Sequence, residues 1–62
     1  MPYVNIRVAG TLSKEQKQKI SKGVTEVISE VANKPPEGIL IMIDELQHEN
    51  VAKKGTLVEP PK

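Results

Sequence analysis

The run Ile39-Leu40-Ile41-Met42-Ile43 is the feature that most limits how this chain can fold. Its residues are all apolar, without alternation, which is typical of a β-strand that is covered on both faces. The chain has only 62 residues, and a domain of that size buries only about 60% of the surface that its unfolded chain exposes. One chain therefore has too few residues to cover both faces of this strand, and we expect a second copy of the chain to cover one of them.

The first residues alternate in polarity, which predicts a half-buried strand over residues 2–9. The apolar face of this strand holds Pro2, Val4, Ile6 and Val8. Gly10 and Thr11 end it. Arg7, the only arginine of the chain, belongs to the opposite face, where we expect a surface ion pair or a contact between subunits.

The pattern changes to that of a helix after Ser13, a favourable N-cap that forms a capping box with Gln16. Apolar residues then recur along one stripe of the predicted helix, at Ile20, Val24, Val27, Ile28 and Val31. Pro35 and Pro36 stop the helix, because proline lacks the amide donor and restricts the residue before it. The apolar run 39–43 then forms the second strand.

A strand, a helix and a second strand with short connections form a β-α-β unit with parallel strands and a right-handed crossover. We therefore predict an α/β (α+β) fold in one domain, residues 1–62, completed by oligomerisation. Asp44 and Glu45 are expected to cap the strand edge, and residues 47–54 to form a polar loop before a short strand at 56–58. Residues 59–62 read as a flexible tail.

Composition excludes several classes of function. The chain has no cysteine and one histidine, His48, so we predict no metal site. The net charge of +1 offers no field for nucleic acid or an anionic membrane. No apolar run approaches the roughly 18 residues of a membrane span, and the start lacks the regions of a signal peptide. We expect a cytoplasmic protein that binds neither nucleic acid nor membrane.

Several short segments, taken in order, resemble the 4-oxalocrotonate tautomerase family. They are Met1-Pro2-Tyr3-Val4, residues 12–17 at the helix start, residues 23–28, residues 34–37, Ile43-Asp44-Glu45, and residues 50–55, which are similar to the glycine-rich hairpin of that family. The resemblance implies a β-α-β subunit with a short C-terminal hairpin, assembled as a hexamer of three dimers. It also implies cofactor-free isomerisation of a small unsaturated keto acid, enol or related carbonyl compound.

The same resemblance implies that Met1 is removed and that the Pro2 nitrogen is the catalytic base. A free amino-terminal proline is a secondary amine, unlike any internal backbone nitrogen. Its pKa starts from the α-amino value of about 7.7–8.0 and falls in an apolar pocket, which suits a base that must be partly unprotonated near neutral pH. If Met1 stays in place, the Pro2 nitrogen is a tertiary amide without useful basicity.

The chain departs from the family at the pocket. Well-studied members bind substrate carboxylates with two arginines, and the matching positions here are Leu12 and Leu40. The hairpin aromatic of the family is Val51, and Lys53 is the best substitute cation. A lysine replaces bidentate recognition only as a point charge. We therefore predict an apolar substrate-binding pocket formed by Leu12, Leu40, Val51 and Lys53, which handles dicarboxylates poorly.

Two other functions remain open at this stage. The missing arginines favour a family member with little or no catalysis, which acts as an oligomeric structural or binding protein. A ribbon–helix–helix DNA-binding dimer also begins with a strand and a helix. That fold needs a second helix where this chain has the apolar run 39–43, and the nearly neutral charge also disfavours it.

Overall fold

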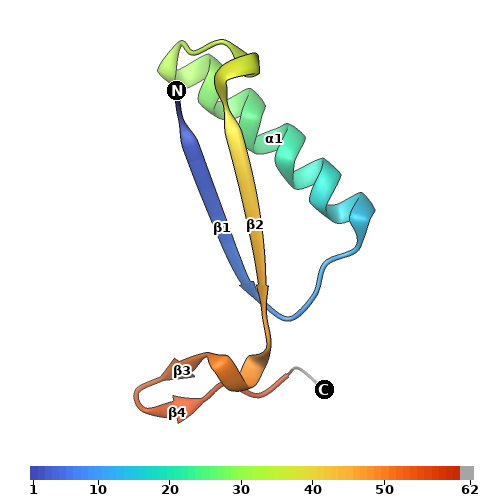
Figure 1. The fold of residues 1–62 in the computed structure, drawn as a ribbon, viewed down its shortest axis with the longest axis vertical. Coiled ribbons are helices and arrows are strands. Elements are labelled where there is room, and N and C mark those ends of the chain that lie inside the picture. Colours follow the sequence, from blue (N-terminus) through green and yellow to red (C-terminus); the bar gives the residue numbers. More distant parts are fainter. Residues whose placement is uncertain (61–62) are drawn as a thin grey trace.

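The computed structural model describes residues 1–60. Strand β1 (Tyr3–Ala9) is followed by helix α1 (Lys14–Ala32), and a 3-10 turn, η1 (Pro36–Gly38), leads into β2 (Leu40–Leu46). A second 3-10 turn, η2 (His48–Asn50), precedes the short strands β3 (Ala52–Lys53) and β4 (Thr56–Leu57). Strands β1 and β2 pair in parallel, and β3 and β4 form an antiparallel hairpin beyond the end of that sheet (Figure 1). The predicted β-α-β unit with a C-terminal hairpin is confirmed.

Helix α1 begins and ends as its sequence predicts. The Ser13 side chain accepts from the Gln16 amide while the Gln16 side chain accepts from the Ser13 amide, so both halves of the capping box are present. Asn33 ends the helix in the left-handed conformation, with φ of 55°, which asparagine tolerates better than most residues. Pro35 and Pro36 then turn the chain back toward the sheet.

Strand β2 is longer than the apolar run predicted. It pairs with β1 over seven positions, from Tyr3 beside Leu40 to Ala9 beside Leu46, and so includes Asp44 and Glu45. The end of β2 is set by its backbone pairing with the full length of β1. Polar side chains do not end a strand when each of them has a hydrogen-bond or ion-pair partner. The expected loop at 47–54 also contains η2 and β3. The hairpin turns at Lys54 and Gly55, where φ is 53° and 80°, as in a type I′ turn.

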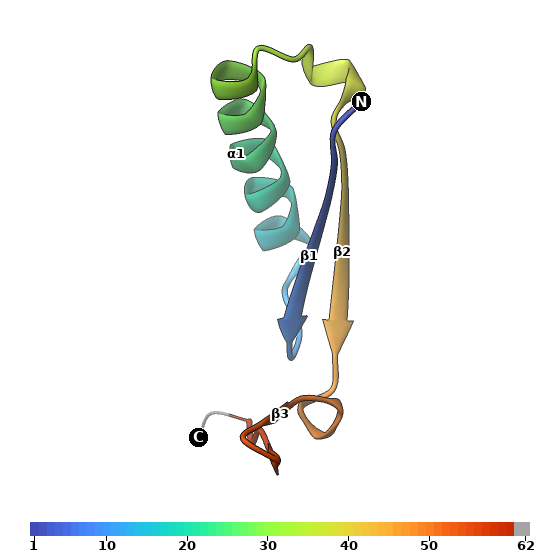
Figure 2. The ribbon, with the colours of Figure 1, turned by 90° about the vertical axis from the view of Figure 1, so that its left-hand side faces the viewer.

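The helix covers one face of the sheet and leaves the other open (Figure 2). Alternation places Val4, Ile6 and Val8 of β1 on the half-buried, helix-covered face. The open face carries Tyr3, Leu40 and Met42, which are 67%, 49% and 40% exposed. No residue within 1–60 is fully buried in the single chain. The cover predicted for the second face of the apolar strand is therefore absent from one subunit.

Part of the predicted tail, residues 61 and 62, lies outside the described residues. Within 1–60, no helix has the length and apolar character that crossing a bilayer demands.

Candidate active site

Pro2 lies directly before β1, at the end of the sheet where both strands begin (Figure 1). Its carbonyl oxygen accepts a hydrogen bond from the Leu40 amide at 3.0 Å, and the residue is half-buried. By alternation Pro2 belongs to the same face as Val4, the face that α1 covers. The backbone of Pro2 is thus anchored to β2 at its first residue.

Leu40 lies at the same end of the sheet but on its other face. It is the partner of Tyr3 in the register of the sheet, and both side chains are exposed on the open face. Pro2 and Leu40 are therefore neighbours along the backbone with side chains on opposite faces. A pocket that uses both of them has to lie around the edge or end of the sheet.

The other three predicted site residues lie at the opposite end. Leu12 is half-buried in the turn between β1 and α1, Val51 is half-buried just before β3, and Lys53 is exposed in β3. A strand of seven residues spans about 20 Å. The structure therefore does not bring the five predicted residues together within one chain, and it divides them between the two ends of the sheet.

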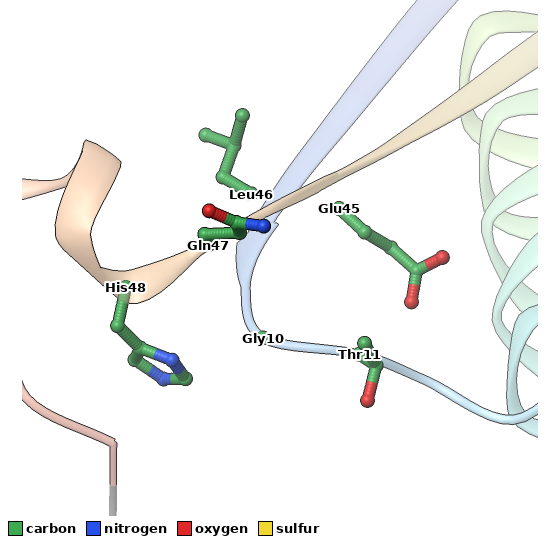
Figure 3. Close-up of a pocket in the computed structure, with 6 residues that line it drawn as sticks. All are labelled: Gly10, Thr11, Glu45, Leu46, Gln47 and His48. Atoms are coloured by element: carbon green, nitrogen blue, oxygen red, sulfur yellow. The ribbon is translucent and has the colours of Figure 1, made fainter.

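A cavity of about 400 Å³ lies at this second end (Figure 3). The end of β2, the turn after β1 and the start of η2 line it with Gly10, Thr11, Glu45, Leu46, Gln47 and His48. The sequence alone does not reveal this cavity, because its lining comes from two segments that are distant in the chain. Gly10, which directly follows β1, is the one sequence signal that could have indicated the cavity.

Gly10 and His48 fit together at the wall of the cavity. A Cβ added at Gly10 would lie 3.1 Å from His48 Cε1, closer than nearly all ordinary Cβ contacts, and Gly10 has φ of +105°. The Gly10 amide donates to the Leu46 carbonyl at 2.7 Å. Glycine is therefore required here both by its backbone conformation and by the imidazole packed over it. His48, which belongs to the predicted polar loop 47–54, is half-buried.

Glu45 joins the end of β2 to the start of α1. Its Oε2 accepts from the Leu12 backbone amide at 2.8 Å, and its Oε1 lies 2.7 Å from Lys17 Nζ. The hydrogen bond from Lys17, and next the one from the Leu12 amide, hold the pKa of the Glu45 carboxyl below its usual value. An ionised carboxylate therefore fixes the turn that carries Leu12.

The adjacent carboxylate, Asp44, faces the other way. Its Oδ2 lies 3.4 Å from Arg7 Nε and accepts a hydrogen bond from the Asn5 amide group at 3.1 Å. Arg7 therefore makes the expected ion pair, on the open face and largely exposed. Asp44 and Glu45 thus lie on the opposite faces that strand alternation predicts, but inside β2 and not at its end, so they do not cap the strand. Within 1–60, no group of three His, Cys, Asp or Glu side chains is arranged to hold a metal.

Comparison with known proteins places this geometry in a family. The family model described as "Tautomerase enzyme" matches residues 2–60. A probable tautomerase of Campylobacter jejuni is 35% identical over 60 residues, which cover 95% of this chain and 88% of that protein.

Comparison with solved structures supports the same family. The crystal structure of DmpI from Helicobacter pylori has a TM-score of 0.86 at 32% identity, over 92% of this chain and 90% of that one. A structure of the 4-oxalocrotonate tautomerase isozymes from Methylibium petroleiphilum has a TM-score of 0.84 at 25% identity, over 90% of each chain. The chain therefore belongs to the tautomerase family, and the resemblance to 4-oxalocrotonate tautomerases in its sequence is confirmed.

Proposed function

We propose that this protein is a cofactor-free tautomerase of small unsaturated keto acids or enols, with amino-terminal Pro2 as its general base. The observation that carries the proposal is the extent of the family match, which begins at Pro2 and runs to residue 60. The half-buried place of Pro2 at the start of β1 supports it. Removal of Met1 would leave a secondary amine there, partly shielded from water.

The proposed reaction is a net proton shift. The unprotonated Pro2 nitrogen removes the hydroxyl proton of an enol while the carbonyl forms, and the resulting ammonium delivers a proton to the carbon. Substrate and product have the same composition, so no oxidant, reductant or cofactor is consumed. Such positioned proton transfer contributes about 10²–10⁴-fold to a rate. A base with a pKa near the working pH performs both halves of the cycle.

A complete pocket requires more than one copy of the chain. Within residues 1–60, no strand pairs with the outer edge of β1 in the two-stranded sheet. Two copies that pair along this edge in antiparallel fashion, about a two-fold axis, bring the first residue of one β1 beside the last residue of the other. Pro2 of one copy then approaches the turn that carries Leu12 in its partner. We propose that three such dimers form a hexamer, which also covers the open face.

The pocket is proposed to be largely apolar, with Leu12, Leu40 and Val51 as walls and Lys53 as its cation. Lys53 is exposed in the hairpin, from which an ammonium on a flexible stem can reach a single carboxylate. Leu12 and Leu40 occupy the two positions at which well-studied family members bind substrate carboxylates with arginines. We therefore propose monoacids with an apolar or aryl end as substrates. Dicarboxylates would leave one charge without a partner.

The second candidate function is an oligomeric structural or binding protein with little catalysis. The leucines at positions 12 and 40 favour it, since neither can bind a substrate carboxylate. The two candidates share the fold and the assembly, so only turnover at Pro2 separates them.

The deciding experiment measures ketonisation of an aryl-conjugated enol such as phenylenolpyruvate, on protein whose intact mass shows loss of Met1. Pro2→Ala should lower kcat/KM by about 10²-fold or more. Two controls isolate the amine. Pro35→Ala changes an exposed proline that is not among the predicted site residues and should retain activity. A protein with extra residues before Met1 keeps every side chain but blocks the Pro2 nitrogen as an amide, and should be inactive.

Equal rates for Pro2→Ala and the wild type would refute Pro2 as the base. Absence of turnover in wild-type protein that has lost Met1, with a series of monoacid and diacid enols, would favour the second candidate function.

A further inference from the structure

Glu45 is the polar exception on the helix-covered face of β2. By alternation it follows Ile41 and Ile43 on that face, where an apolar side chain would pack against α1. Its side chain is 29% exposed and both of its oxygens have partners in the chain. Water can still reach this carboxylate, so burial does not force the pairing of both oxygens. The two contacts within the chain therefore point to a specific task.

The partners of Glu45 identify that task. Leu12 is 33 positions away in the sequence and donates its backbone amide, whereas Lys17 lies in the first turns of α1. The turn between β1 and α1 is thus held at two places: Gly10 by the Leu46 carbonyl and Leu12 by the Glu45 carboxylate. Gly10 and Thr11 line the cavity directly beside this turn, and Glu45 forms part of the same wall (Figure 3).

We propose that Glu45 is a positioning residue of the tautomerase site: its carboxylate holds the turn that carries Leu12, and so sets the wall against which the apolar end of the substrate binds. This inference rests on the proposed function. Glu45 touches neither substrate nor the reacting atoms. It acts through Leu12, and the effect of losing it falls on substrate binding rather than on the proton transfer at Pro2.

The ion pair of Asp44 with Arg7 provides a matched control. It is formed by the adjacent residue of the same strand, but on the open face and without contact to the turn at Leu12. Asp44→Asn and Glu45→Gln each remove one charge from β2 and keep the shape of the side chain. If Glu45 acted only as a surface charge, the two substitutions would have the same effect.

The experiment measures kcat and KM for phenylenolpyruvate in Glu45→Ala, Glu45→Gln and Asp44→Asn, with hydrogen exchange of the Leu12 amide on the same samples. Displacement of a pocket wall by about 1 Å costs up to about a hundredfold in catalysis. We expect Glu45→Ala to raise KM about tenfold, with kcat within twofold of the wild type, and to speed exchange at Leu12. Glu45→Gln keeps an acceptor for the Leu12 amide and should recover part of the loss.

Several results would overturn the inference. These are an unchanged KM in Glu45→Ala, an equal rise in KM in Asp44→Asn, or a fall in kcat without a change in KM. Should Glu45→Ala fail to fold, Glu45→Gln decides: an unchanged KM together with unchanged exchange at Leu12 would refute the role. Failure of the proposed tautomerase function would give a different result from failure of the role of Glu45. In that case Pro2→Ala would retain the activity of the wild type, or the wild type would have no activity.

Discussion

The exposed apolar side chains on the open face of the sheet predict that a single negative charge there will dissociate the protein. Met42 lies near the middle of β2 on this face, beside Asn5, and is 40% exposed in one chain. We consider Met42→Asp, which places a carboxylate where the proposed assembly covers the sheet. In a single chain the new carboxylate would remain in water, so the variant subunit should keep its own backbone fold.

The expected magnitude follows from that exposed fraction. Complete burial of a methionine side chain contributes about 1.5–3 kcal/mol, so covering the remaining 40% contributes about 1 kcal/mol per subunit. An aspartate loses this contribution, and its desolvation without a partner costs several kcal/mol more. The total is at least about 3 kcal/mol per subunit, which weakens association by at least about a hundredfold for each subunit added.

Sedimentation equilibrium over a range of chain concentrations measures this change. Wild-type protein should be oligomeric, and its urea midpoint should rise with concentration because assembly stabilises the fold by mass action. Gln18→Glu adds the same charge at an exposed position of α1 and should leave the mass unchanged. The reasoning is refuted if Met42→Asp keeps the wild-type mass and midpoint. It is refuted equally if the wild type is a stable monomer whose midpoint does not depend on concentration.

Three further predictions concern stability. Gly10→Ala should destabilise the protein by about 1–3 kcal/mol, because its φ is +105° and the new Cβ would crowd the His48 ring. Gly23→Ala, in α1 with nothing within 4 Å of the added Cβ, should stabilise it by about 0.8–1 kcal/mol in the same urea titration. The pKa of Glu45 is lowered by folding, so its contribution to stability is complete above its unfolded pKa and is lost as the pH falls through its folded pKa. Urea midpoints measured from neutral to acid pH should therefore fall less steeply in Glu45→Gln than in the wild type, and parallel curves would contradict this.

Local patterns predicted most of the secondary structure because the interactions that decide it are local. The alternation at 2–9, the capping box at Ser13 and the prolines after Asn33 each act within a few residues, and each is confirmed. The end of β2 was predicted too early. Its limit depends on pairing with β1 and on partners for Asp44 and Glu45. Those partners lie far away in the sequence, so polarity alone was a poor guide.

The site could be predicted only in part, for a physical reason. Pro2, Leu12 and Lys53 were selected by resemblance, which assigns positions but does not place them in space. The structure shows that one chain holds Pro2 and Leu12 at opposite ends of the sheet. The bond from the Leu12 amide to Glu45 joins residues 33 positions apart. No spacing rule predicts such a bond, because it depends on the crossover that brings the end of β1 beside the end of β2.

We expect that assembly and catalysis cannot be separated in this fold. Leu40 illustrates why: its side chain is 49% exposed on the open face, where it needs a cover, and it is also a predicted wall of the substrate pocket. A second copy at that end of the sheet would meet both needs, since it would bury the leucine and bring the turn with Leu12 toward Pro2. The Met42→Asp variant is therefore expected to lose turnover together with its oligomeric mass, although Met42 is not among the predicted site residues. Full activity in a dissociated subunit would mean that the pocket forms within one chain, against the division of the site that the sheet imposes.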